Sequence, residues 1–212
     1  MLNTNPMRKL RAVALLARPA GLAVLEDCLL AHPAVELVAV ATHRLRPRSE
    51  DPARSVRPEM AHFERLCDAA RLPLIVADDR AAATDLPFLS GLPPVDLLCS
   101  VSWRFILSAA ALRAPTVGAI NLHRGALPAY GGAEPVRRML EDGCPDAVIT
   151  AHLMVEEVDA GPTIGTVHLP MNWDRRTSAA AHAELVKERL IPLYPKLMGL
   201  AIETMIVRHE KP

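Results

Sequence analysis

The sequence has little of several features that mark whole classes of protein. Lys plus Arg and Asp plus Glu number 24 each, so no overall positive field is available to gather a polyanion such as tRNA or DNA. No apolar run approaches the ~20 residues that a membrane-spanning helix needs. The four cysteines form no C-x-x-C pair, which is typical of reduced thiols in a cytoplasmic protein and not of a disulfide framework or a zinc site.

What the sequence does contain is an alternation of short apolar runs with helical patterns. Half of its residues are apolar, enough for a real core in a chain of 212 residues. Runs rich in Val, Leu and Ile alternate with helical stretches, which is typical of βα units that build a parallel sheet. No repeat or low-complexity linker divides the chain. We therefore predict a single α/β domain over residues 1–212, with a Rossmann-like, mostly parallel sheet flanked by helices.

The apolar runs predict the positions of the individual elements. We expect strands at residues 10–17, 35–42, 74–77, 95–101, 117–123 and 148–155. We expect helices at residues 21–31, 58–71, 108–113 and 134–142. A last long helix over residues 178–207 would be broken or kinked by Pro192 and Pro195.

One basic segment interrupts this alternation. Residues 42–58 hold five arginines, three prolines and two acids, and they follow a predicted strand. A solvated surface loop explains this composition. A basic rim at the carboxyl edge of the sheet, which meets an acidic acceptor or a phosphate, explains it as well. The residues leave both interpretations open.

Two polar side chains stand at the end of the strand predicted over residues 117–123. Asn121 and His123 are two positions apart, so in a strand they face the same side of the sheet. The carboxyl ends of strands are where ligands bind in open α/β sheets. On its own, however, an Asn-x-His pattern also fits a capping asparagine and a hydrogen-bonded core histidine.

A second polar segment strengthens the functional interpretation. Residues 150–163 supply His152 and then an acidic turn with Glu156, Glu157 and Asp159. A carboxylate beside an imidazole raises the fraction of imidazolium and orients the ring. Amide, imidazole and carboxylate groups from adjacent strand ends would make an acid–base site, although a solvated acidic turn is the simpler alternative.

Taken in order, these motifs resemble a known family. N-L-H at residues 121–123, a Leu-Pro turn, Tyr-x-Gly, and H-x-x-x-E-E-x-D-x-G-P from His152 are similar to the folate-dependent formyltransferases. That family includes glycinamide ribonucleotide, methionyl-tRNA and sugar formyltransferases. The resemblance is strong over about residues 95–169. It implies the formyltransferase fold and a catalytic Asn-His-Asp set, which falls here on Asn121, His123 and Asp159.

The resemblance implies a role for each of these three residues. In such enzymes an amine attacks the formyl carbon of 10-formyltetrahydrofolate and an oxyanion develops. Asn121 and protonated His123 would donate hydrogen bonds to this oxyanion, and each such donor typically contributes about 3–4 kcal/mol. Asp159 would hold the imidazolium and relay the proton that leaves the amine.

The resemblance also implies a site for the formyl donor. Its pterin would lie in a slot lined by Ile106 and Leu107, for which core packing is the alternative, and main-chain groups of residues 155–159 would bind its polar edge. Trp103 and Phe105, two of only seven aromatic residues, are assigned to packing. The implied cofactor-binding residues are Ile106, Leu107, Leu127, Val155, Glu156, Glu157 and Val158.

Departures from the family pattern narrow the range of possible acceptors. Residues 17–23 read ARPAGLA where glycinamide ribonucleotide enzymes carry a glycine-rich loop that cradles a phosphate, so a phosphoribosyl acceptor is disfavoured. We expect no C-terminal β-barrel domain of the kind found in tRNA-directed members, which disfavours charged tRNA. Relatives usually have Ser-Leu-Leu-Pro where Arg124 is followed here by Gly125-Ala126-Leu127-Pro128. This change indicates an altered donor pocket or a different acceptor charge.

The sequence therefore predicts a cytoplasmic enzyme, a 10-formyltetrahydrofolate-dependent N-formyltransferase. Its acceptor would be a small-molecule amine such as an amino sugar, an amino acid or a hydroxylamine, and we expect no nucleic acid, membrane or metal partner. A formyltetrahydrofolate hydrolase and a non-catalytic folate-binding protein of the same fold are less favoured. The intact Asn121, His123 and Asp159 argue against the non-catalytic protein. The long C-terminal helix is compatible with a homodimer and equally with packing inside one chain.

Overall fold

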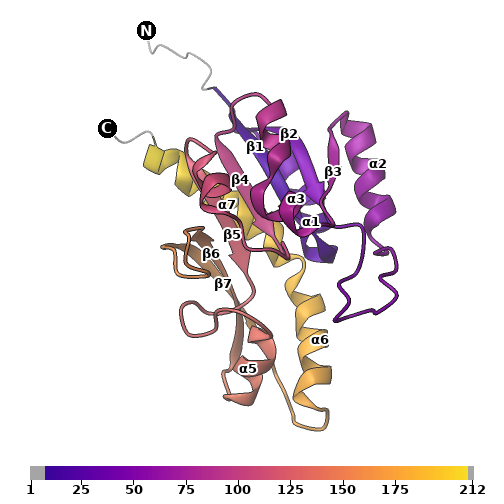
Figure 1. The fold of residues 1–212 in the computed structure, drawn as a ribbon. Helices are drawn as coiled ribbons and strands as arrows, with labels where there is room; N and C mark the ends of the chain where they lie inside the picture. Colours follow the sequence, from indigo (N-terminus) through magenta and orange to yellow (C-terminus); the bar gives the residue numbers. More distant parts are fainter. Residues whose placement is uncertain (1–7, 210–212) are drawn as a thin grey trace.

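One seven-stranded sheet organises the protein, and the computed structural model describes residues 8–209. The strands are β1 (Leu10–Leu16), β2 (Val35–Thr42), β3 (Leu74–Val76), β4 (Leu97–Val101), β5 (Gly118–His123), β6 (Asp146–Leu153) and β7 (Thr163–Pro170). They lie in the order β3-β2-β1-β4-β5-β6-β7 (Figure 1). The strands β3, β2, β1, β4 and β5 pair in parallel, whereas β6 and β7 follow β5 in the sheet and pair antiparallel. The prediction of a mostly parallel α/β sheet is confirmed.

Helices cover both faces of this sheet. They are α1 (Arg18–Asp27), α2 (Met60–Ala70), α3 (Arg80–Asp85), α4 (Ala109–Arg113), α5 (Pro135–Glu141), α6 (Ala179–Leu190) and α7 (Leu193–His209), with 3-10 turns at Leu29–Ala31 and Pro87–Gly91. Successive residues of a strand point to opposite faces. The strands therefore contribute to two cores, one under α1 and α7 and a smaller one under α4 and the loops around it.

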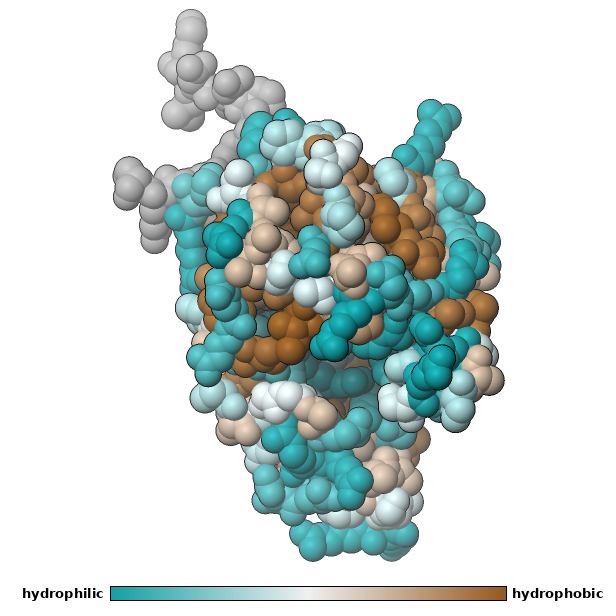
Figure 2. Space-filling model, in the orientation of Figure 1, coloured by the Kyte–Doolittle hydropathy of each residue, from teal (hydrophilic) through white to brown (hydrophobic). Residues whose placement is uncertain are grey.

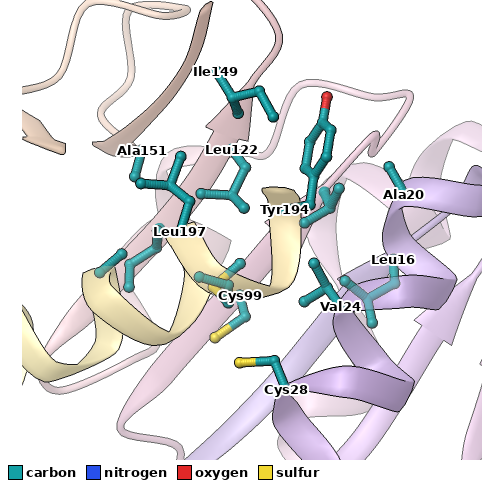
Figure 3. Packing of buried hydrophobic residues seen from close by; sticks show 14 of the residues in the cluster. Leu16, Ala20, Val24, Cys28, Cys99, Leu122, Ile149, Ala151, Tyr194 and Leu197 are labelled. Carbon is teal, nitrogen blue, oxygen red and sulfur yellow. The ribbon is translucent and has the colours of Figure 1, made fainter. Parts of the chain in front are cut away.

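The larger core fixes α1 and α7 against the sheet. Tyr194 leaves the first turn of α7 and belongs to one buried cluster with Leu16, Val24, Leu122 and Leu197, with its hydroxyl pointing away from Leu16 and Val24 (Figure 3). Fully burying a side chain such as Leu or Val contributes about 1.5–3 kcal/mol to the stability of the fold. The position of Tyr194 is therefore set by the same apolar contacts that hold the helix.

The C-terminal helical segment is the clearest test of the predicted proline break. α6 ends at Leu190, α7 begins at Leu193, and the pair bends by 55°. Pro192 lies at this break, as predicted, whereas Pro195 lies in the first turn of α7, where a missing N–H disturbs no helical hydrogen bond. Among residues 8–209 no single helix is long and apolar enough to cross a membrane, and α6 and α7 reach that length only as a bent pair.

Three other elements differ from the sequence prediction. β7 and α3 were not predicted, and α1 begins at Arg18 instead of residue 21. β7 is an edge strand with no fully buried residue, so its apolar pattern is weak. α3 has only six residues and is capped by Asp79, whose side chain accepts a hydrogen bond from the Ala82 N–H. This cap is a local signal, but the helix is too short for a helical periodicity to show.

Candidate functional site

The ends of β5 and β6 bring polar side chains together. The antiparallel register pairs Asn121 with His152 and His123 with Thr150. The turn after β6 then returns Asp159 to both histidines. The three residues expected to form the site, Asn121, His123 and Asp159, are thus neighbours, and His152 joins them.

Asp159 is the carboxylate that links the two histidines. Its Oδ2 lies 3.3 Å from His123 Nδ1, and its Oδ1 lies 3.6 Å from His152 Nε2. The Gly132 N–H donates to Oδ2 at 2.8 Å. Asp159 has a left-handed backbone with φ 58°, which a short polar residue tolerates better than most. This conformation turns the carboxylate back over the strand ends.

The ring of His123 is held between two oxygens. Its Nε2 lies 2.8 Å from the Tyr130 carbonyl oxygen, and its Nδ1 faces Asp159. A carbonyl and a carboxylate both accept hydrogen bonds. Both contacts are satisfied together only when each ring nitrogen carries a proton. Both oxygens thus lie where a protonated His123 would donate to them, and the protonated form itself stays a prediction.

His152 has a different pair of partners. Its Nδ1 donates to the Leu153 carbonyl oxygen at 2.9 Å, which leaves Nε2 to accept from Asn121 Nδ2 at 3.1 Å. Burial lowers the pKa of His152 below its ordinary value. We infer a neutral ring that orients Asn121. Because an amide nitrogen carries two N–H groups, the second remains available to a ligand.

The loop after β5 approaches His123 so closely that it needs a glycine. A Cβ atom at Gly125 would lie 2.5 Å from the Tyr130 carbonyl oxygen and 2.9 Å from His123 Nε2. The Gly125 carbonyl accepts from the Thr150 hydroxyl at 2.7 Å, which ties this loop to β6. The unusual Gly125 in the motif thus allows the contact between His123 and Tyr130.

A cavity of about 460 Å³ opens beside this cluster. In Figure 2 apolar residues border a hollow whose floor is polar. Asn121, His123, His152 and Asp159 line the cavity. Four of the predicted cofactor-binding residues line it too: Ile106, Leu107, Val155 and Val158. Amide, imidazole and carboxylate groups therefore meet an apolar wall in one space of the size that small ligands occupy.

Three predicted cofactor-binding side chains do not line this cavity. Glu156 pairs with Arg113 at 3.2 Å on the surface, and Glu157 is exposed. The Leu127 N–H lies 3.4 Å from the Thr150 hydroxyl oxygen. For Leu127, Glu156 and Glu157, contact with the donor stays a prediction.

The wall of the cavity at residues 102–107 is braced by the basic segment 42–58. His43 is buried, with Nδ1 donating to the Ala77 carbonyl at 2.7 Å and Nε2 accepting from the Arg104 N–H at 3.3 Å. Burial lowers the pKa of His43 to about 4, so the ring is neutral. Its ring stacks on Trp103 with centroids 4.1 Å apart. The segment therefore supports the site, while its five arginines do not line the cavity.

Some cavity residues carried no signal in the sequence. Ser100 lies beside Asn121 in the β4–β5 register, and its buried hydroxyl has no partner among residues 8–209. Tyr194 reaches the cavity from α7. Both lie in apolar runs of separate elements, so only the packed structure could identify them.

Comparisons with known proteins place this geometry in context. A family model described as "Formyl transferase" matches residues 7–182. A methionyl-tRNA formyltransferase of Thermotoga maritima is 32% identical over 179 residues, covering 82% of this chain and 55% of the relative. One of Chlamydia caviae is 31% identical, covering 76% of this chain and 48% of the relative. The chain thus spans about half the length of these curated relatives.

Solved structures agree with the fold. Phosphoribosylglycinamide formyltransferase from Brucella melitensis has a TM-score of 0.67 at 20% identity, with 92% of this chain and 94% of that chain covered. Glycinamide ribonucleotide transformylase 1 from Symbiobacterium toebii has a TM-score of 0.66 at 21% identity, with 92% and 86% covered. At this identity the likeness concerns the fold alone.

Proposed function

The chain belongs to the formyl transferase family, and we propose that it transfers a formyl group from 10-formyltetrahydrofolate to the amine of a small molecule. Membership confirms the resemblance that the motifs indicated, including the expectation of an enzyme family. The observation that carries the proposal is the clamp on His123, between the Tyr130 carbonyl and Asp159, at the edge of a cavity with an apolar wall.

The residues of the cavity fit the proposed donor. Ile106, Val155 and Val158 are exposed large apolar side chains at its border, and a flat heteroaromatic ring would cover them. Leu107 is buried beneath. When bound, the donor supplies the formyl group, and the apolar wall would orient it and exclude water from the polar cluster.

In the proposed reaction the polar cluster stabilises the negative charge that develops on the formyl oxygen and moves the amine proton. As the amine attacks the formyl carbon, negative charge grows on the formyl oxygen, and Asn121 would donate its remaining N–H to it. His123 would donate there too, by exchanging its contact with the Tyr130 carbonyl. Asp159 would hold the imidazolium and relay the amine proton to the folate nitrogen, which leaves as its bond to the formyl carbon breaks. Neutral His152 would keep Asn121 in the donating orientation.

The acceptor is the open part of this proposal. We favour a small amine, because the net charge is zero and polyanion binding depends on positive charge. Charged tRNA is a second candidate, since the curated relatives above are named methionyl-tRNA formyltransferases. Water as the acceptor would make the protein a hydrolase of the donor, and donor binding without turnover would make it a folate-binding protein.

A donor-consumption assay separates these possibilities. The purified protein would be incubated with 10-formyltetrahydrofolate, alone and with amines, and loss of the donor followed by absorbance. Loss that requires an amine supports transfer, and loss without an amine means hydrolysis. Calorimetric titration with 5-formyltetrahydrofolate, repeated on the exposed-site variant Ile106→Trp, tests donor binding separately. No binding by the folded wild-type protein would refute the donor assignment.

A further inference from the structure

Arg124 is a second charged residue at the end of β5, and the site described above does not use it. It directly follows His123 and lines the same cavity. Arg124 is the first residue after β5, and Tyr194 lines the same cavity close enough for the arginine charge to act on the pKa of its phenol.

The guanidinium of Arg124 lacks partners in the described part of the chain. Its Nε is buried without a hydrogen bond, and no carboxylate among residues 8–209 forms an ion pair with it. An unsatisfied buried donor on a charged group is costly. Arg104, also at the cavity, likewise has a buried Nε without a hydrogen bond. It differs from Arg124 because its terminal nitrogens donate to the Leu45 and Asp78 carbonyls, and Nη2 lies 3.9 Å from the Asp78 carboxylate.

The surroundings leave the positive charge of Arg124 uncompensated. Glu134 lines the cavity, but its carboxylate is paired with Lys187 at 3.1 Å. The Tyr194 hydroxyl forms no hydrogen bond within residues 8–209. Burial raises the pKa of Tyr194, and the charge of Arg124 opposes that rise. A neutral phenol therefore lies close to an arginine, and both can donate hydrogen bonds into the cavity.

We propose that Arg124, assisted by the Tyr194 hydroxyl, binds an anionic group of the acceptor. The inference rests on the proposed formyl transfer and narrows its substrate class to amines that carry a phosphate or a carboxylate. A planar guanidinium suits either anion, because it donates two parallel hydrogen bonds to a pair of oxygens.

Anion binding can be measured without turnover. In ¹⁵N-labelled protein saturated with 5-formyltetrahydrofolate, the Nε–H signal that is missing from Arg124→Gln belongs to Arg124. Inorganic phosphate and succinate are titrated separately, which distinguishes the two kinds of anion. We expect a saturable shift of the Arg124 signal with one of them, at concentrations that leave exposed Arg176 unchanged. An Arg124 signal that moves no more than that of Arg176 overturns the proposal.

Steady-state kinetics with pairs of charged and uncharged amines test the same proposal during turnover. Glucosamine 6-phosphate is compared with glucosamine, and 4-aminobutyrate with butylamine. Arg124→Gln should lower kcat/KM for the anionic member of the accepted pair roughly 10- to 100-fold, the range of a charge-assisted hydrogen bond. The uncharged member should change by less than about 3-fold, as should both members in Arg176→Gln. Arg124→Lys should restore part of the loss.

The outcomes separate the two proposals. An equal loss for charged and uncharged amines in Arg124→Gln means that the arginine is structural, and it overturns the anion site. If the wild-type protein consumes no donor with any amine, the proposed transfer fails. The Arg124 titration still decides the anion site in that case.

Discussion

The polar cluster and the apolar wall of the same cavity differ in how they meet solvent. The side chains of His152, His123 and Asp159 are only 3%, 10% and 12% exposed. On the wall, Ile106 is 62% and Val158 is 52% exposed. Polar groups are thus buried and apolar groups uncovered, the reverse of the usual order. The fold already holds the polar groups in place, whereas the apolar side chains of the wall become buried only when a ligand covers them.

The largest expected effect falls on the buried side of this comparison. Asp159→Asn should lower amine-dependent donor consumption roughly 10²- to 10⁴-fold, because an amide cannot hold the imidazolium or take up a proton. Asn tolerates the left-handed backbone at this position, so folding should be preserved. Initial rates measure the loss, with 5-formyltetrahydrofolate binding and the thermal midpoint as controls. A rate within about 3-fold of the wild type would remove Asp159 from the mechanism.

Gly125→Ala should disturb the cluster through packing alone. The added methyl would lie 2.5 Å from the Tyr130 carbonyl oxygen, so the loop or the His123 ring must shift. We expect the free energy of unfolding to fall by about 1–3 kcal/mol, and the rate to fall with it. Gly91→Ala is the matched control, since nothing lies within 4 Å of its added methyl. Urea denaturation of both variants is the measurement, and equal midpoints would contradict the close approach.

The stability that buried His43 contributes beneath the cavity wall should depend on pH. The pKa of His43 is about 4 in the folded protein, against an ordinary value of 6.5. The unfolded chain takes up this proton first as the pH falls, so the stability that neutral His43 contributes is complete above 6.5 and is lost toward 4. Between about pH 7.5 and about pH 5 the loss is roughly 2 kcal/mol.

Replacing the ring tests this pH dependence. His43→Phe should unfold in urea with a weaker dependence on pH than the wild type. Part of the dependence should remain, because burial also lowers the pKa of His152. An unchanged dependence in His43→Phe would show that His43 does not titrate as its burial requires.

The smallest effect is expected at the exposed wall. Ile106→Ala with Val158→Ala should weaken 5-formyltetrahydrofolate binding roughly 10-fold, because less apolar surface is covered on binding. The free energy of unfolding should change by less than about 0.5 kcal/mol, since both side chains are exposed in the free protein. Val207→Ala, also exposed, is the control that should alter neither quantity. Calorimetry measures the binding, and full affinity in the double variant would place the donor elsewhere.

Much of the site could be predicted from local pattern. Asn121 and His123 share a face because a strand has a period of two, and the acidic turn after His152 indicated a carboxylate nearby. The β5–β6 register then placed His152 opposite Asn121, which makes it part of the cluster. The family match is consistent with the motifs that suggested it. β7 could not be predicted, because a half-exposed edge strand has a weak apolar pattern.

By itself, then, the sequence determined the alternation of strands and helices, the family, and the residue types available for acid–base chemistry. These depend on near neighbours in the chain, where periodicity and spacing are sufficient. Only the tertiary structure decided that His43 braces the wall, that Tyr194 reaches the cavity from α7, and that Arg124 has no partner among residues 8–209 while Arg104 does. Those relations join residues far apart in the chain, and each depends on which polar groups the packing of the core leaves within reach of one another.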